Sequence, residues 1–598
     1  MALFLLTTAG ICHAQTYANP ILHCDWSDPD VFRVGEDYYM TASSFNFFPG
    51  LPILHSRDLV HWTQVGAALS DYPGDDESFK DGSFRNVVRH GEGVWAPAIR
   101  FHDGWFYIFC GDPDRGIFMV RTQDPSGPWE APVWVVKERG FIDPCPFWDE
   151  DGKAYLSHAL AGSRAGLKSV ILVAPMSKDG SRLEGPSRVV YDGHLTQPTI
   201  EGTKMYKRDG YYYIFAPAGG VATGWQTVLR SESPFGPFEE RIVLSSSENV
   251  QETPGTLFGR TVIPGRRYSR MTERRSRREG NASALNVGEI NGPHQGAWVS
   301  TPSGEDWFIH FQDNGAYGRI IHLQPMRWDS EGWPVIGDDP DGDGCGAPVP
   351  EYALPSGGSE IAEEQVYCPY GLDPAWQYPC VPSPIWHMAL PDGGVRLYGV
   401  LQSDAEASLW NCPNFLSRKF PFESFSVTAK LSFRPNPKAK DAAQQAGFAV
   451  MGSDYAALRL MDTPGGARLE YALCLDAPEG GSEEVRVLAT LPYSFLGVEH
   501  SRQSRSVPEV RYEDIPEASI WVRLEVGPSP VRGNVPDARC NFSYSTDGRR
   551  FSKAGGTFTA KAGTWVGARF GFFCSRFAPS NDSGCLDITE ITLSPGAP

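Results

Sequence analysis

The chain repeats one short pattern of apolar and polar positions. An apolar stretch opens at a polar or small residue, a polar turn with glycine follows, and a second, aromatic stretch comes next. The five copies read DPDVFRVGEDYYM, APAIRFHDGWFYIF, DPCPFWDEDGKAYL, EGTKMYKRDGYYYIF and QGAWVSTPSGEDWFIHF. Short aromatic stretches separated by glycine turns are typical of β-hairpins, so each copy predicts a strand, a turn and a second strand.

Five repeated β-meanders, spaced by tens of residues, predict a five-bladed β-propeller over residues 15–345. The innermost strand of every blade begins at the same end of the central channel, so the opening residues of the copies should converge. These opening residues are Asp28, Ala96, Asp143, Glu201 and Gln295. Three of the five are acidic, and clustered carboxylates destabilise a fold unless a ligand or a reaction uses them. The pattern therefore indicates a functional site.

One interval between copies is too long. The last two openings are 94 residues apart, whereas the other intervals span 47 to 68 residues. The excess lies in residues 253–288, which hold eight arginines and no lysine and lack strand periodicity. We interpret this segment as a disordered insertion foreign to the fold and expect it to be dispensable.

A second domain follows the repeats. Residues 346–380 are rich in proline, glycine and aspartate and are predicted to form a linker. Residues 381–598 then alternate between apolar and polar positions in seven to nine segments, as in FSVTAKLSF and SIWVRLEVG, which predicts a β-sandwich of the concanavalin-like or jelly-roll kind. The DPDGDG motif at 339–344 resembles the start of an EF-hand loop, but the twelfth position is Pro350 instead of glutamate, so a polar turn is favoured.

The composition limits the classes of partner that the protein can bind. The 598 residues carry a formal net charge of −19, which argues against nucleic acid and anionic membranes and favours a neutral ligand. Residues 1–14, with a short apolar core and a small residue before Gln15, are predicted to be a secretory signal. Eleven cysteines remain after its removal, an odd number without metal-type spacing, so at least one thiol should be unpaired.

Carboxylates at the end of a channel suit acid–base hydrolysis of a neutral sugar. Glycoside hydrolysis needs a general acid at the leaving oxygen and a base or a nucleophile on the opposite face. Asp28 and Glu201 can supply these two groups. Asp30, two residues after Asp28, is interpreted as a cap at the start of its strand.

The same residues resemble glycoside hydrolase family 43. The resemblance rests on the stretch around SDPDVFRVGEDYYM, on VWAPAIR, FIDPCPFWDEDGKAYL, TIEGTKMYKRDGYYYIF and INGPHQGAW, and on GAYGRIIHLQPMRW. It covers nearly the whole chain after the signal, apart from residues 253–288, and the C-terminal part resembles the appended concanavalin-like sandwich of the family.

The resemblance implies a role for each acid. Asp28 matches the catalytic base, Glu201 matches the general acid, and Asp143 matches the aspartate that orients the acid and tunes its pKa. The family inverts the anomeric configuration. We expect the sandwich to form a wall of the site, because exo-action requires a closed far end and a bare propeller channel is open.

The resemblance also implies substrate contacts. Phe45 and Trp95 would flank the terminal sugar, and Arg319 would bond its hydroxyl groups. His294 matches a histidine that in several members helps to hold a structural cation, so it is the candidate ligand for a structural calcium near the propeller axis. No cofactor is required for the reaction.

The sequence thus predicts a secreted, exo-acting, inverting pentosidase: a β-xylosidase, an α-L-arabinofuranosidase, or both. Its partners would be plant cell-wall oligosaccharides or polysaccharides. One alternative is a related propeller fructosidase, disfavoured because SDPDV, IDP and IEG stand where that group has NDPNG, RDP and EC. The other is a non-catalytic carbohydrate-binding protein, disfavoured because all three acids are present.

Overall fold

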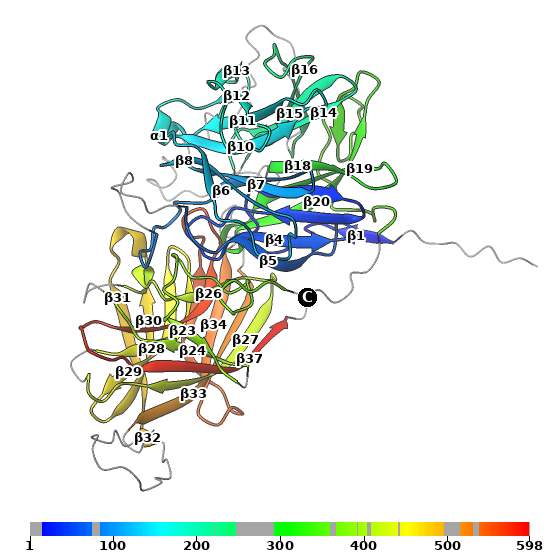
Figure 1. The fold of residues 1–598 in the computed structure, drawn as a ribbon. Helices are drawn as coiled ribbons and strands as arrows, with labels where there is room; N and C mark the ends of the chain where they lie inside the picture. The colour runs from blue at the N-terminus through cyan, green and yellow to red at the C-terminus, as the bar shows by residue number, and fades with distance from the viewer. Residues whose placement is uncertain are drawn as a thin grey trace, which may run out of the picture.

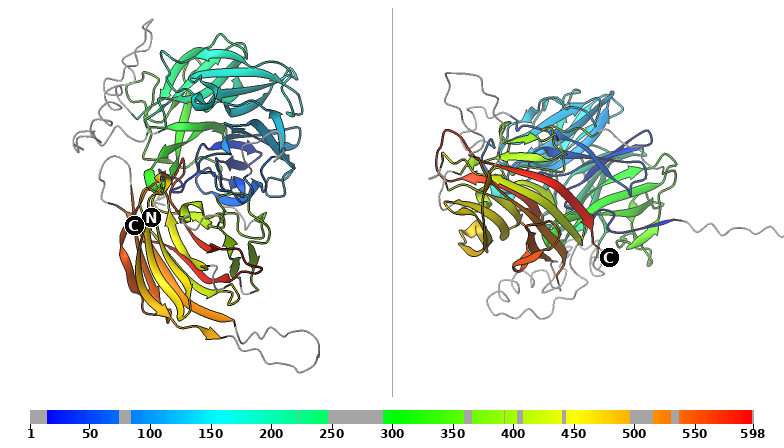
Figure 2. Two further views of the ribbon diagram at one scale, coloured as in Figure 1. Left: turned by 90° about the vertical axis from the view of Figure 1, so that its left-hand side faces the viewer. Right: turned by 90° about the horizontal axis from the view of Figure 1, so that it is seen from below.

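Almost every regular element of the chain is a β-strand, and the strands form two bodies stacked end to end (Figures 1 and 2). The computed structural model describes residues 15–73, 84–221, 223–246, 292–358, 366–391, 393–402, 408–439, 443–495, 515–529 and 537–596. The predicted signal segment 1–14 and the arginine-rich segment 253–288 lie outside these ranges. Within them, no helix is long and apolar enough to cross a lipid bilayer.

The first body consists of five four-stranded antiparallel sheets. Each sheet is built from consecutive strands, as the repeat predicts.
The first is β2 (Asp30–Val34), β3 (Asp37–Thr41), β4 (Gly50–Ser56) and β5 (Thr63–Leu69). The second is β6 (Trp95–His102), β7 (Trp105–Asp112), β8 (Gly116–Thr122) and β9 (Val133–Val136). The third is β10 (Phe141–Trp148), β11 (Ala154–Leu160), β12 (Val170–Met176) and β13 (Arg188–Asp192), with the short helix α1 (Gly162–Ala165).

The fourth and fifth sheets complete the ring. The fourth is β14 (Lys204–Arg208), β15 (Tyr211–Ala218), β16 (Trp225–Ser231) and β17 (Glu239–Leu244). The fifth is β18 (His294–Ser300), β19 (Asp306–Asp313), β20 (Arg319–Trp328) and β21 (Pro334–Ile336), with the 3-10 turn η1 (Gly315–Tyr317) between β19 and β20. The predicted five-bladed propeller is confirmed.

Apolar side chains fill the space between neighbouring blades. Five separate clusters of buried residues each join two adjacent sheets; for example, Leu156 of the third blade packs with Phe109 of the second, and Ile309 of the fifth packs with Val31 of the first. A middle strand of a blade is therefore covered on both faces. This explains why stretches such as YYYIFAPA are continuously apolar instead of alternating.

A buried ion pair links the first two blades beside the axis. Asp30 Oδ2 accepts hydrogen bonds of 2.6 Å from the backbone N–H of Ile99 and from Arg100 Nη1, and Arg100 Nη2 donates to Cys145 Sγ of the third blade. The interpretation of Asp30 as a strand cap is wrong, because its partners lie on the neighbouring blade. Its carboxylate neutralises a buried arginine.

The same layer blocks the channel. Asp30, Cys145 and the fully buried Lys204 follow the opening residues of their blades by two or three positions, so they lie deeper along the axis. Beyond them a hollow of about 370 Å³ forms the far mouth, with Arg100 in its wall. The expectation of an open bare channel is wrong, since the inner strands close it with their own polar side chains.

The second body is a sandwich of one eight-stranded and one seven-stranded sheet. The larger sheet holds β23 (His387–Ala389), β24 (Val395–Tyr398), β27 (Phe425–Arg434), β32 (Ser494–Phe495), β33 (Pro516–Pro528), β34 (Ala538–Ser545), β35 (Ser552–Ala560) and β37 (Cys585–Pro595). The smaller holds β25 (Val400–Leu401), β26 (Leu416–Lys419), β28 (Gln445–Met451), β29 (Tyr455–Thr463), β30 (Gly466–Cys474), β31 (Glu483–Leu491) and β36 (Arg569–Arg576). Two further 3-10 turns are η2 (Leu409–Asn411) and η3 (Ala477–Glu479).

The predicted sandwich is confirmed, but it has more strands than the seven to nine expected. The edge strands β31 and β35 escaped prediction because most of their residues are exposed and do not alternate cleanly between buried and exposed positions. Edge strands bury only part of their surface, so their sequence carries a weak signal.

The predicted linker is held against the propeller. Its strand β22 (Glu351–Ala353) pairs with the N-terminal strand β1 (Thr16–Ala18), and Tyr378 and Phe48 exchange backbone hydrogen bonds of 2.7 and 2.9 Å. The main sandwich core also includes Tyr317 and Ile320 of the fifth blade. The two domains therefore share packed surface.

The described part of the chain contains eleven cysteines, from Cys24 to Cys585, and all are free thiols. Seven of them are buried: Cys110, Cys145, Cys380, Cys412, Cys474, Cys540 and Cys574. Such cysteines pack as small apolar side chains.

Candidate active site

The opening residues of the inner strands share an unusual backbone conformation. Asp28, Ala96, Asp143 and Gln295 have φ values of 54°, 35°, 55° and 35°. In the fourth blade the left-handed residue is Gly202, directly after Glu201. A positive φ is strained for residues with a side chain and persists where the surroundings hold it, commonly at functional sites. The turn therefore recurs at the opening residue of four blades, and in the fourth blade it lies one residue after Glu201.

Asp28 is buried and held by two neighbours. Its Oδ2 accepts a 2.6 Å hydrogen bond from Ser43 Oγ, and Arg319 Nη1 lies 3.3 Å from Oδ1 and 3.4 Å from Oδ2. Ser43 Oγ in turn accepts the backbone N–H of Ala96 at 2.7 Å. A hydrogen-bonding hydroxyl and a nearby guanidinium both restrict the orientation of a carboxyl group. Asp28 is thus fixed in position.

Asp143 is tied to the next blade, directly beside Glu201. Its Oδ2 accepts a 2.7 Å hydrogen bond from the backbone N–H of Gly202. A side chain at position 202 would clash, since a Cβ there would lie 2.8 Å from Gln295 Cγ. Glycine therefore allows the close approach that brings residue 201 beside Asp143.

Glu201 carries the proton of this pair. Burial, then the negative charges of Asp143 and Asp28, raise the pKa of Glu201 well above its ordinary value. About 30% of its side-chain surface remains open, and protein surrounds the carboxyl group on its other sides. Burial also raises the pKa of Asp143, but the N–H of Gly202 favours its charged form. Glu201 is consequently the protonated member.

His294 lies beside Glu201. Its Nε2 is 3.6 Å from Glu201 Oε1, and burial, followed by Arg319, lowers the pKa of His294 to about 3. The imidazole is therefore neutral and does not draw the proton from Glu201. Calcium binds six to eight oxygen atoms, and the described residues place no cluster of three acidic, histidine or cysteine ligands here. These side chains alone do not form a calcium site, and the metal role of His294 stays a prediction.

Arg319, the partner of Asp28, lies among a set of aromatic rings. The guanidinium carbon lies 5.8 Å from the ring centre of Phe45, 5.0 Å from that of Phe311 and 5.8 Å from that of Trp565. Trp95 meets the rings of Phe45 and Trp565 edge-on, at 6.4 and 6.1 Å. Aromatic faces beside a fixed arginine suit a small polar ring with hydroxyl groups.

Trp565 comes from the sandwich, so the second domain contributes to the site, as predicted. Its side chain is 49% exposed and its φ is 65°. The loop that carries it packs tightly on the propeller, because a Cβ on Gly91 would lie only 2.4 Å from Thr564 Cγ2.

Asp25 holds this loop in place. Its Oδ1 accepts the backbone N–H of Arg319 and its Oδ2 accepts that of Gly567, both at 2.9 Å. Lys419 of the sandwich donates to the backbone oxygen of Asp25 at 2.6 Å. One buried side chain thus joins Arg319 of the propeller to the Trp565 loop.

Comparisons with known proteins agree with this architecture. The sequence model of glycosyl hydrolases family 43 matches residues 17–256, and that of the beta-xylosidase C-terminal concanavalin A-like domain matches residues 369–590. A putative beta-xylosidase from Xylanibacter ruminicola is 32% identical over 93% of this chain and 86% of its own length. The chain belongs to glycosyl hydrolases family 43.

A second family 43 relative differs in its named activity. A non-reducing end alpha-L-arabinofuranosidase from Bacteroides ovatus is 30% identical over 75% of this chain and 76% of its own length. Among solved structures, a xylan beta-1,4-xylosidase from Bacillus halodurans has a TM-score of 0.70 at 22% identity, covering 96% of this chain and 99% of the other. At that identity the likeness concerns the fold.

The structure of this family 43 protein brings the predicted residues together. Asp28, Asp143, Glu201, Phe45, Trp95, Arg319 and His294 all lie within one connected set of contacts. Sequence reasoning did not name Ser43, Asp25, Phe311 or Trp565. Of these, Trp565 has the strongest local signal, a lone tryptophan between glycines, but such a signal does not identify its partner.

Proposed function

We propose that this family 43 enzyme is an exo-acting, inverting hydrolase that releases terminal pentoses. The substrates would be β-D-xylosides, α-L-arabinofuranosides, or both, in xylan, arabinan or xyloglucan-type oligosaccharides. The observation that carries the proposal is the contrast between Asp28, fixed beside Ser43 and Arg319, and Glu201, whose pKa is raised by burial and by the charges of Asp143 and Asp28. An acid–base glycosidase requires one carboxyl group that accepts a proton and one that donates a proton.

The reaction would proceed by single displacement. Asp28 takes a proton from a water molecule while the oxygen of that water attacks the anomeric carbon. Glu201 gives its proton to the glycosidic oxygen, whose bond to the same carbon breaks. The products are a free pentose of inverted configuration and a shortened saccharide with a new hydroxyl group. Solvent then restores the proton on Glu201 and removes the one on Asp28.

Asp143 acts through Glu201 in this scheme. Its negative charge keeps the proton on the acid until the leaving oxygen needs it, and its hydrogen bond to the N–H of Gly202 positions the acid against the neighbouring blade. It is a positioning residue.

Two features support exo-action. The layer of Asp30, Arg100 and Lys204 fills the axis below the acids, so a sugar chain cannot pass through the propeller. Phe45, Trp95 and Trp565 lie near Arg319 and one another, and such aromatic faces beside an arginine suit a single terminal sugar. The reaction uses no cofactor, and a structural cation near His294 is not part of it.

The substrate class rests on the names of the relatives, one a putative beta-xylosidase and the other a non-reducing end alpha-L-arabinofuranosidase. Xylopyranose and arabinofuranose present similar hydroxyl groups to a terminal subsite, so both belong to the proposal. The fructosidase alternative is not favoured by these relatives. A non-catalytic binding protein is also not favoured, because each proposed catalytic group, Asp28, Asp143 and Glu201, has neighbours that support its proposed role.

Nitrophenyl glycosides test the proposal. The protein should release nitrophenol from the β-D-xyloside, the α-L-arabinofuranoside or both, and not from a fructoside analogue. Hydrolysis of the fructoside alone would favour the fructosidase. Oligosaccharide binding without release of any nitrophenol would favour a binding protein.

We also propose that the protein is exported, with cleavage after Ala14. The apolar segment 1–14 and a polymeric plant substrate outside the cell support this. N-terminal sequencing of protein from the culture medium of an expressing cell should read from Gln15.

A further inference from the structure

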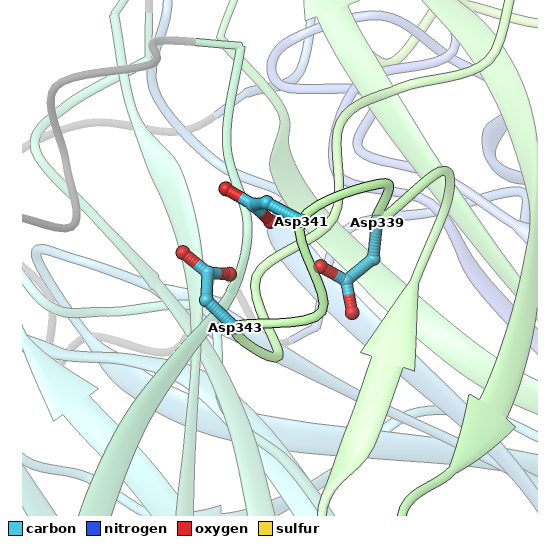
Figure 3. A group of neighbouring side chains, drawn as sticks. All are labelled: Asp339, Asp341 and Asp343. Atoms are coloured by element: carbon cyan, nitrogen blue, oxygen red, sulfur yellow. The ribbon is translucent and has the colours of Figure 1, made fainter.

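A short aspartate loop follows the last strand of the propeller. Residues 338–347 leave β21 and fold back on themselves, and the backbones of Asp338 and Ala347 exchange hydrogen bonds of 2.9 and 2.7 Å. Asp339, Asp341 and Asp343 alternate with proline and glycine inside the loop. Figure 3 shows their carboxyl groups turned toward a common centre, and one oxygen of each lies within 4.8 Å of the others.

Asp339 is the inner member of this cluster. Its side chain is only 2% exposed. Oδ2 accepts a 3.0 Å hydrogen bond from Arg327 Nη2, but Oδ1 is enclosed and has no hydrogen-bond donor within the described ranges. A buried carboxylate oxygen without a partner is costly and requires an explanation. A cation between the three aspartates would supply the missing partner.

We propose that this aspartate loop binds a calcium ion. The side-chain donors are all carboxylate oxygens, which hard cations prefer, whereas zinc favours nitrogen and sulfur. Calcium accepts six to eight oxygens in irregular geometry, so backbone carbonyls and water can complete the three carboxylates. Magnesium demands a near-ideal octahedron and suits a short loop less well.

The loop differs from an EF-hand. Gly342 and Gly344 have φ values of 72° and 90°, which lets the chain curl around the carboxyl groups without strain. Pro350 stands where an EF-hand has its bidentate glutamate. The Kd for calcium should therefore be about 10⁻⁴ to 10⁻³ M, as in extracellular calcium modules. The absent glutamate therefore weakens the site but does not abolish it.

The ion would stabilise the joint between two blades. The N–H of Gly346 donates to Val243 of β17 at 3.1 Å, and the N–H of Ser245 donates to Gly346 at 3.0 Å. The loop thus connects the outer edges of the fourth and fifth blades just before the linker. Loss of calcium should affect stability and leave catalysis unchanged.

Calorimetric titration of the full chain, after EDTA treatment, tests the proposal. Calcium should bind to the aspartate loop in the millimolar to submillimolar range, separately from any ion near His294, and 10 mM calcium should raise Tm by about 2–5 °C. The Asp341→Asn, Asp343→Asn double variant should lose the binding heat and the Tm shift. In EDTA the double variant should be at least as stable as the original protein, because it lacks the charge repulsion among the three loop carboxylates. Its kcat/KM at 25 °C should be unchanged.

A matched control removes two turn aspartates elsewhere. Asp103 and Asp209, 87% and 80% exposed, lie in turns of the second and fourth blades. The Asp103→Asn, Asp209→Asn variant should keep the full calcium response. A calcium response that persists in the loop variant, or a protein that gives no response at all, would overturn the proposal. Magnesium at the same concentration should produce a smaller shift.

Discussion

The backbone N–H of Gly202 donates a 2.7 Å hydrogen bond to Oδ2 of Asp143, which ties the residue after the proposed acid to the carboxylate of the neighbouring blade. This contact gives Asp143 two effects on Glu201: its charge keeps the acid protonated, and its hydrogen bond fixes the backbone beside it. The two effects can be separated by experiment.

Asp143→Asn keeps an acceptor for Gly202 but removes the charge. The pKa of Glu201 should fall, and because the acid works only when protonated, activity should be lost at lower pH. We expect the alkaline limb of the kcat/KM profile to move by about one pH unit toward acid, with little change in KM. Asp151→Asn, in an exposed turn of the same blade, is the control. An alkaline limb that stays in place would show that Asp143 does not tune the acid.

Leaving groups distinguish the proposed acid from the proposed base. Glu201→Ala should lower kcat/KM by about 10²- to 10⁴-fold on a natural disaccharide, and by less than about tenfold on a dinitrophenyl glycoside, whose departure needs little proton donation. Asp28→Ala should slow both substrates alike, because water activation is lost in each case. Steady-state rates on the two substrates make the comparison. Equal losses for Glu201→Ala would refute its role as the acid.

The first product formed should have the opposite anomeric configuration to the substrate. Single displacement by water inverts the anomeric carbon, whereas a covalent intermediate would preserve it. Proton NMR of the released pentose, recorded before mutarotation, gives the answer directly. Retention would require a different role for Asp28 even within the family.

Trp565→Ala should weaken catalysis without destabilising the fold. Trp565 is 49% exposed, so little buried surface is lost, but the sandwich ring that lies beside Arg319 disappears. We expect a fall in kcat/KM of about three- to tenfold, mainly through KM, and an unchanged Tm. Phe495→Ala, 64% exposed on the sandwich, should change neither. Kinetics indistinguishable from the parent would remove Trp565 from the site.

A chain truncated after Gly344 should aggregate. Tyr317 and Ile320 of the fifth blade are buried in the sandwich core and would become exposed, and Arg319 would lose Trp565. Solubility and light scattering, compared with the full chain, provide the measurement. A soluble propeller that cleaves nitrophenyl pentosides normally would make the sandwich unnecessary for catalysis.

The propeller and its acids could be predicted from the sequence because the repeat itself aligns them. Once five copies are superposed, Asp28, Asp143 and Glu201 occupy equivalent positions, and the geometry of a propeller brings them to one end of the axis. The same reasoning failed for Asp30, because a strand start suggests a local cap, while its actual partner, Arg100, is determined by the packing of two blades.

Contacts between the two domains could not be predicted in the same way, because no repeated sequence pattern marks the residues that form them. Trp565 lies far from Arg319 along the chain, and nothing in the local pattern of either residue indicates the other. Asp25 likewise reads as an ordinary polar residue before a tryptophan. Its role depends on two backbone N–H groups, which every residue except proline possesses and which therefore cannot be identified from sequence.

The double use of the Asp25 carboxylate constrains how this protein can change during evolution. The backbone N–H groups of Arg319 and Gly567 donate to its two oxygens. A sandwich domain from another protein would therefore have to place its equivalent of the 564–567 loop within hydrogen-bond distance of Asp25. A shuffled partner that folds perfectly would still leave one oxygen of Asp25 unsatisfied and the arginine poorly anchored. Propeller and sandwich should consequently be inherited together. Changes in substrate preference should then involve paired substitutions on the two sides of this domain interface.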